Sequence, residues 1–189
     1  TGEIEAFIVV AADGTDARRD EYSPGRKGAD YLRFLVEELK PMVDGTWRTD
    51  PGRSAIAGAS MGGLISFYAA WQRPDVYFGA ACLSPAFVER YGNPCFRMVE
   101  EAQGKWPDLK LFLSCGGAAG LETELLDGTL KMANLLRTSG YPEKNLTVRI
   151  ESWAEHNEEA WARMTPHWLR FLFARPQVAG AEPGSKRKE

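Results

Sequence analysis

The sequence contains few cysteines, no long apolar run and no excess of positive charge, and each absence narrows the class of protein. Its three cysteines (Cys82, Cys95 and Cys115) are an odd number without a CxxC pair, which argues against a disulfide framework and a thiolate zinc site. No apolar run approaches the roughly 20 residues of a membrane-spanning helix. The net charge is −3, from 23 Lys+Arg and 26 Asp+Glu. We therefore expect neither nucleic acid nor a membrane as a partner.

The composition fits one compact domain. A chain of 189 residues, 44% of them apolar, is long enough to bury a sizeable core without covalent cross-links. We expect a single domain over residues 1–175 and a disordered tail over 176–189, where Pro, Gly and charge are mixed. No signal peptide is visible, which favours the cytoplasm. This holds only if no N-terminal segment is missing, and the chain does not begin with methionine.

Short apolar runs alternate with helical patterns along the whole chain. Such alternation predicts an α/β fold, with a mostly parallel sheet covered by helices on both faces. Ligands in these folds bind beyond the carboxyl ends of the strands, so functional residues should follow Ala11, Ala57, Leu83, Ser114 and Ile150. The predicted strands are 6–11, 54–57, 77–83, 109–114 and 146–150, and the predicted helices are 29–43, 64–72, 95–103, 129–138 and 161–173.

Two of these helices carry finer predictions. In the first helix one apolar stripe should face the core, made of Tyr31, Leu32, Leu35, Leu39 and Met42. In the last helix, Thr165-Pro166 has the form of an N-cap followed by proline at the first helical position. We therefore expect that helix to restart at this point.

A GxSxG pattern, Gly58-Ala59-Ser60-Met61-Gly62, stands between a predicted strand and a predicted helix. This is the context of a nucleophile elbow, in which a serine in a sharp turn needs glycines two residues away on either side. The Ser60 hydroxyl would then stand at a helix N-terminus, where the N–H of Met61 could stabilise an oxyanion. The alternative is an ordinary glycine-rich turn that binds phosphate or only packs.

A serine nucleophile needs a base, and the chain has two histidines. His156 follows the last predicted strand, at the edge where catalytic residues are expected, and it fits the chain order Ser…acid…His. His167 lies within a predicted helix, where a packing or surface role is more common. No metal-ligand spacing connects the two histidines, so we expect no metal site.

The acid is less clearly marked. It should follow a late strand, and Glu122 is the first carboxylate after the strand 109–114, with Glu124 and Asp127 about one turn later. All three could instead be acidic residues that stabilise a helix N-terminus. Glu155, beside the histidine, should point elsewhere if that loop is extended.

Several segments resemble one family, the esterases of the α/β-hydrolase class that include enterochelin esterases, feruloyl esterases and S-formylglutathione hydrolases. The resemblance implies that Ser60 is the nucleophile and His156 the base. The family acid commonly falls near Ala118-Ala119, where this sequence has no carboxylate, so either Glu122 substitutes or the site is a Ser-His dyad. The resembling segments are 15–24 (TDARRDEYSP), 29–42, 54–87 (beginning SAIAGASMGG) and 155–173 (beginning EHNEEAW).

The resemblance also implies a shortened N-terminus. The family has further strands before the one that matches residues 6–11, and a loop among them supplies a second oxyanion N–H. An exposed sheet edge would remain, which water tolerates poorly. We therefore expect this chain to self-associate as a homo-oligomer and to be slower than a longer form.

Together these features predict a serine carboxylesterase that acts on a small-molecule ester and needs no cofactor. We expect Arg18, Tyr22 and Trp153 to line the substrate pocket. Two alternatives remain: an acyltransferase on the same fold, in which an alcohol replaces water, and a non-catalytic hydrolase-like binding domain.

Overall fold

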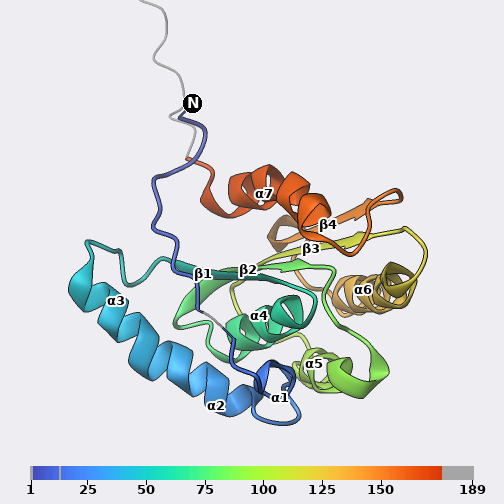
Figure 1. The fold of residues 1–189 in the computed structure, drawn as a ribbon, viewed down its shortest axis with the longest axis horizontal. Coiled ribbons are helices and arrows are strands. Elements are labelled where there is room, and N and C mark those ends of the chain that lie inside the picture. The colour runs from blue at the N-terminus through green and yellow to red at the C-terminus, as the bar shows by residue number, and fades with distance from the viewer. Residues whose placement is uncertain (1, 13, 176–189) are drawn as a thin grey trace, which may run out of the picture.

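The structure, a computed structural model, describes residues 2–12 and 14–175. Within these residues a four-stranded, fully parallel sheet has the order β1-β2-β3-β4 (Figure 1). The α/β class and the parallel sheet predicted from the sequence are confirmed. The strands are β1 (Ser54–Ala59), β2 (Tyr77–Leu83), β3 (Lys110–Gly116) and β4 (Leu146–Glu151).

Helices cover both faces of the sheet. On one face α4 (Met61–Gln72) packs on β1 and β2, α6 (Leu121–Thr138) packs on β3, and α5 (Glu89–Glu101) lies against both helices. On the other face α7 (Glu158–Phe173) packs on β2 and β3 (Figure 1). Because helices cover both faces, the inner strands are apolar almost throughout. The sheet is thus a rigid layer whose carboxyl ends can position a site.

The strand register brings the ends of β1 and β2 level with Ser114, two residues before the end of β3. Ala59 of β1 pairs with Leu83 of β2, and Leu83 pairs with Ser114 of β3. The residues that follow these pairs therefore emerge together at the carboxyl edge of the sheet. This edge is where the sequence predicted functional residues.

The predicted strand at residues 6–11 is wrong. Residues 5–12 form no ladder, and the side chains of Phe7, Ile8, Val9 and Val10 are 40–77% exposed. Contacts near its start anchor the segment: Glu5 N–H donates to the Phe173 carbonyl over 3.0 Å, and the Phe7 ring stacks on the Phe173 ring with centroids 5.4 Å apart. A cavity of about 1020 Å³ separates the segment from β1. An apolar run becomes a strand only when another strand pairs with it, and within the described residues none does.

The N-terminal helix contains a π-helical segment that changes which side chains face inward. It runs from α2 (Gly28–Arg33) through the π-helical η1 (Phe34–Leu39) into α3 (Lys40–Thr46). Leu32 and Leu35 are buried as predicted, but Met42 is 61% exposed. A π turn takes in more residues than an α turn, so it rotates the apolar stripe beyond it. The prediction that Met42 faces the core is wrong for this reason.

Other helix boundaries also differ from the sequence prediction. The predicted polar loop 15–28 contains a short helix, α1 (Arg18–Glu21), and a 3₁₀ turn, η2 (Glu143–Asn145), precedes β4. The helices α4, α5 and α6 begin earlier than predicted, α6 by eight residues. The helix α7 continues through Pro166 without restarting, because Met164 and Leu172 on its buried face pack against β2 and β3. The predicted disordered tail, 176–189, lies outside the described residues.

Candidate active site

The sharp turn between β1 and α4 holds Ser60 in a strained conformation. Its backbone has φ 58° and ψ −122°, a region that costs a non-glycine residue about 1–3 kcal/mol. Ser60 N–H donates to the Leu83 carbonyl over 2.8 Å, and the Ser60 carbonyl accepts from Ala86 and Leu64 N–H, each over 3.1 Å. The surrounding chain therefore fixes the strained turn. This is the geometry of a nucleophile elbow.

Of the two glycines in the GxSxG pattern, only the first must lack a Cβ for steric reasons. A Cβ on Gly58 would lie 2.5 Å from the carbonyl carbon and oxygen of Gly62, whereas a Cβ on Gly62 would meet nothing within 4 Å. The expectation that both flanking glycines must lack a Cβ is therefore wrong for Gly62. The close approach on that side involves Gly63, whose Cβ would lie 3.1 Å from Pro85 Cα.

Alanine substitutions at these two glycines should have different effects on stability. Gly58→Ala should lower the free energy of unfolding by about 1–3 kcal/mol, because its methyl group would overlap a backbone that cannot move away. Gly62→Ala is the matched control. It should leave the free energy of unfolding unchanged or raise it slightly, since alanine has a higher helix propensity than glycine. Urea unfolding of both variants measures the difference. Equal losses from both would contradict this account of the elbow.

The structure brings Glu122 and His156 together. Glu122 is the second residue of α6, and its side chain is 1% exposed. Its Oε1 lies 2.6 Å from Nδ1 of His156, whose side chain is 21% exposed. Because a carboxylate only accepts, Nδ1 donates in this bond, and in the neutral ring Nε2 therefore keeps its lone pair. The imidazole can therefore accept a proton at Nε2.

Three donors hold the other carboxylate oxygen. Oε2 of Glu122 accepts from Gly116 N–H over 2.6 Å, from Cys115 Sγ over 3.0 Å and from Ser84 Oγ over 3.1 Å. Gly116 permits this approach, because a Cβ there would lie 2.2 Å from the Ala154 carbonyl oxygen and 2.7 Å from Oε2 of Glu122. The buried carboxylate is thus fully surrounded by donors.

These contacts determine the ionisation of the group. Burial alone would raise the pKa of Glu122, but the hydrogen bonds from Cys115, His156, Ser84 and Gly116 together outweigh it, so the pKa is lowered. Burial and the nearby Glu122 carboxylate raise the pKa of Cys115 to about 12, so its thiol keeps its proton and donates. Glu122 is therefore an anion at neutral pH that faces the imidazole.

Ser60 and the Glu122–His156 pair are connected through the segment after β2. Ser60 N–H bonds to Leu83, and the next residue, Ser84, bonds to Glu122. Ser84 also accepts from Trp161 Nε1 over 3.2 Å, and the Trp161 ring stands edge-on to His156 with ring centroids 5.0 Å apart. Ser60, Glu122 and His156 are thus connected through one segment at the carboxyl edge of the sheet.

The other candidate groups lie elsewhere. Glu124 is exposed, Asp127 forms an exposed ion pair with Lys131, and Glu155 is exposed and accepts from Asn157 Nδ2 over 3.3 Å. His167, on α7, accepts at Nδ1 from Arg149 Nη1 over 3.3 Å. Of the carboxylates considered from the sequence, Glu122 is the one that meets His156.

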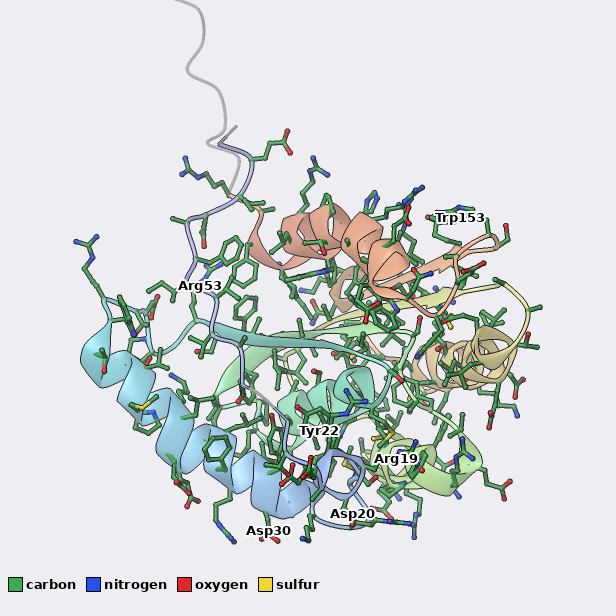
Figure 2. All side chains as sticks on the ribbon, viewed as in Figure 1. Arg19, Asp20, Tyr22, Asp30, Arg53 and Trp153 are labelled. Carbon is green, nitrogen blue, oxygen red and sulfur yellow. The ribbon has the colours of Figure 1, made fainter. Side chains whose placement is uncertain are left out.

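The three predicted pocket residues are not brought together. Arg18 and Tyr22 line the large cavity beside β1, together with Gly58 and Ala59 of the elbow. Trp153 is 51% exposed, and Arg163 Cζ stands 4.8 Å from its ring centroid. Figure 2 shows Trp153 and Tyr22 on opposite sides of the sheet. Trp153 therefore lies outside the cavity that Arg18 and Tyr22 line.

The sequence pattern did not single out three residues that surround the site, namely Ser84, Cys115 and Trp161. Ser84 and Cys115 directly follow Leu83 and Ser114, the strand ends after which functional residues were expected, so their positions could have identified them. Trp161 gave no comparable signal, because a tryptophan within a helix is ordinarily a packing residue. In the described part of the chain no cluster of His, Cys, Asp and Glu side chains could hold a metal ion. Likewise, no described helix is long and apolar enough to cross a membrane.

Comparison with known proteins identifies the family. The family model described as "Putative esterase" matches residues 2–172, which is most of the chain. The chain belongs to this esterase family. The resemblance inferred from the sequence motifs is confirmed.

The individual proteins to which the chain is similar are distant relatives. Protein YbbA of Bacillus subtilis is 24% identical over 89% of this chain and 74% of its own length. The endo-1,4-beta-xylanase/feruloyl esterase of Xylanibacter ruminicola is 26% identical over 91% of this chain and 22% of its own length. A solved ferulic acid esterase has a TM-score of 0.65 and 22% identity over 80% of this chain and 62% of that one. The chain thus spans less than two thirds of that esterase structure, with which it shares the fold.

Proposed function

We propose that this chain is a serine carboxylesterase that hydrolyses small-molecule esters through an acyl-enzyme. The observation that carries the proposal is the 2.6 Å contact between His156 Nδ1 and the buried Glu122 carboxylate, at the same carboxyl edge of the sheet as a serine in elbow geometry. A fixed carboxylate that orients an imidazole is the arrangement that activates a serine hydroxyl. Membership of the esterase family supports the same chemistry.

Each residue has a role that follows from its atoms. Ser60 Oγ attacks the ester carbonyl carbon while His156 Nε2 takes its proton, and the carbonyl oxygen becomes an oxyanion. Met61 is the first residue of α4, a position whose N–H has no partner within the helix, so it can donate to that oxyanion. Glu122 keeps Nδ1 protonated and stabilises the imidazolium.

The second half of the reaction regenerates the enzyme. The tetrahedral intermediate collapses, the bond to the alcohol oxygen breaks, and His156 Nε2 returns the proton to that oxygen. Water then attacks the acyl group on Ser60, with Nε2 taking one proton and passing it back to Ser60 Oγ. The products are the alcohol and the carboxylic acid, and no cofactor takes part.

Covalent labelling tests this proposal. A fluorophosphonate probe reacts with an activated serine, so mass spectrometry of the labelled and digested protein should find the adduct on Ser60. The chain unfolded in urea before labelling is the control and should remain unmodified. Absence of an adduct on Ser60 of the native protein would favour a non-catalytic binding domain.

Glu122 should contribute strongly to turnover. Glu122→Gln should lower kcat by about 10²–10⁴-fold, because the amide no longer holds the proton on Nδ1 or balances the imidazolium. Glu124→Gln is the matched control, since Glu124 is exposed two residues further along the same helix, and it should leave kcat unchanged. An unchanged rate for Glu122→Gln would indicate a Ser-His dyad.

We also propose that two copies of this chain associate through the β1 edge. Phe7–Val10 and the edge of β1 on which no strand of the described residues pairs both face the large cavity. Exposed apolar surface beside such an edge favours association with another chain. Light scattering should therefore give a mass above 21.0 kDa. Val9→Asp should shift it toward the monomer, whereas Met42→Asp, also at an exposed apolar residue, should not. A monomeric native chain would contradict this proposal.

A further inference from the structure

Ser84 occupies the point where the supports of the acid and of the histidine meet. It directly follows β2, is buried, and has φ 41°. Ser84 N–H donates to the Ser114 carbonyl over 2.7 Å, so its backbone is fixed to β3. Its hydroxyl donates to Oε2 of Glu122 and accepts from Trp161 Nε1. Both capacities of this hydroxyl are thus used within the site.

The direction of the Ser84 bond differs from that of the other two donors. Cys115 and Gly116 are neighbours on β3 and approach Oε2 from that strand. Ser84 approaches the same oxygen from the end of β2. The terminal torsion of a glutamate is broad and nearly two-fold, so donors from one side alone leave the carboxylate plane loosely defined. A donor from a second strand fixes the plane and keeps Oε1 directed at His156.

We propose that Ser84 is a positioning residue, whose hydroxyl, held between Trp161 and Glu122, keeps the carboxylate in the orientation in which it bonds to His156. The inference deepens the proposed function and rests on it. Through Trp161, whose ring packs edge-on against the imidazole, Ser84 also links the support of the acid to that of the base. Ser84 itself does not touch the reacting atoms.

Kinetics and magnetic resonance together test the proposal. Ser84→Ala should lower kcat on p-nitrophenyl acetate about tenfold, the effect of losing about one hydrogen bond to a charged group, with KM unchanged within about twofold. The His156 Nδ1 proton should exchange with solvent faster, because its bond to Glu122 loosens. Ser84→Cys, which retains a weak donor of similar size, should be intermediate in both measurements.

Two further variants separate positioning from simple loss of stability. Trp161→Phe keeps a ring beside His156 but removes the donor to Ser84, so it should act through the same hydroxyl, and adding it to Ser84→Ala should lower kcat little further. Tyr141→Phe is the matched control for a lost buried hydroxyl. Tyr141 bonds to the Leu109 carbonyl over 2.7 Å at the opposite end of β3, and its loss should leave both measurements unchanged.

The outcomes distinguish the two proposals. Full kcat in Ser84→Ala, unaltered exchange of the Nδ1 proton, or a loss equal to that in Tyr141→Phe would each overturn the role of Ser84. If the native chain neither reacts with the fluorophosphonate nor turns over ester, the proposed function fails. The exchange measurement needs no substrate, so it still shows whether Ser84 holds Glu122 against His156.

Discussion

Replacing Ser60 with alanine should lower kcat on a p-nitrophenyl short-chain ester by about 10³-fold or more. The change removes the oxygen that forms the acyl-enzyme in the proposed mechanism, so water would have to attack the ester directly. The fold should persist, because the turn is held by backbone bonds of Ser60 to Leu83, Ala86 and Leu64 rather than by its side chain. A strained φ of 58° is no worse for alanine than for serine.

The measurement is steady-state turnover together with urea unfolding of the same preparations. Ser139→Ala is a suitable control, because Ser139 follows the end of α6 that is remote from Glu122. It should retain the native rate. A fall of less than about tenfold in Ser60→Ala would remove Ser60 from the proposed mechanism, since a triad serine typically contributes far more.

The elbow could be predicted from sequence because its physics is local. A strand, a sharp turn and a helix follow one another within about 20 residues, and Gly58 is needed where two backbones approach. The same holds for the alternation of strands and helices, which defined the α/β class. Sequence patterns therefore predict well the features that depend on residues close together in the sequence.

The acid illustrates what the sequence could not decide. Three carboxylates, at positions 122, 124 and 127, follow the third strand of the sheet, and helix phase determines which of them faces inward. We predicted that helix to begin at residue 129, but α6 begins at Leu121. Its second residue, Glu122, is therefore buried beside Gly116 while Glu124 points to solvent. Tertiary contacts, including the missing Cβ of Gly116, fix that phase.

The segment 6–11 shows that an apolar run alone does not establish a strand. Its apolar run is typical of a buried strand, yet Phe7–Val10 remain exposed and unpaired within the described residues. A strand is defined by the ladder with its neighbour, and the composition of one segment does not show whether that neighbour is present. The π-helical segment Phe34–Leu39, which turns Met42 outward, was equally invisible to a periodicity of 3.6.

Replacing His156 with alanine should lower kcat by at least about 10³-fold, close to the loss from Ser60→Ala, because serine and base act as one unit. In the native protein kcat/KM should rise with pH as the imidazole becomes neutral, since a protonated ring cannot accept the proton of Ser60. Removal of the ring should abolish that rise in whatever activity remains. The pH profile therefore tests the role of the base separately from its contribution to the rate.

His167→Ala is the matched control, because His167 is the second histidine of the chain. Its Nδ1 accepts from Arg149, and it lies on α7, where it is not among the hydrogen-bond partners of Glu122. This variant should keep the native kcat and the native pH profile. The contact between His156 Nδ1 and Glu122 Oε1, at 2.6 Å, is the physical reason to expect the difference. Similar losses from both histidines, or a loss from His167→Ala alone, would show that the base has been wrongly assigned.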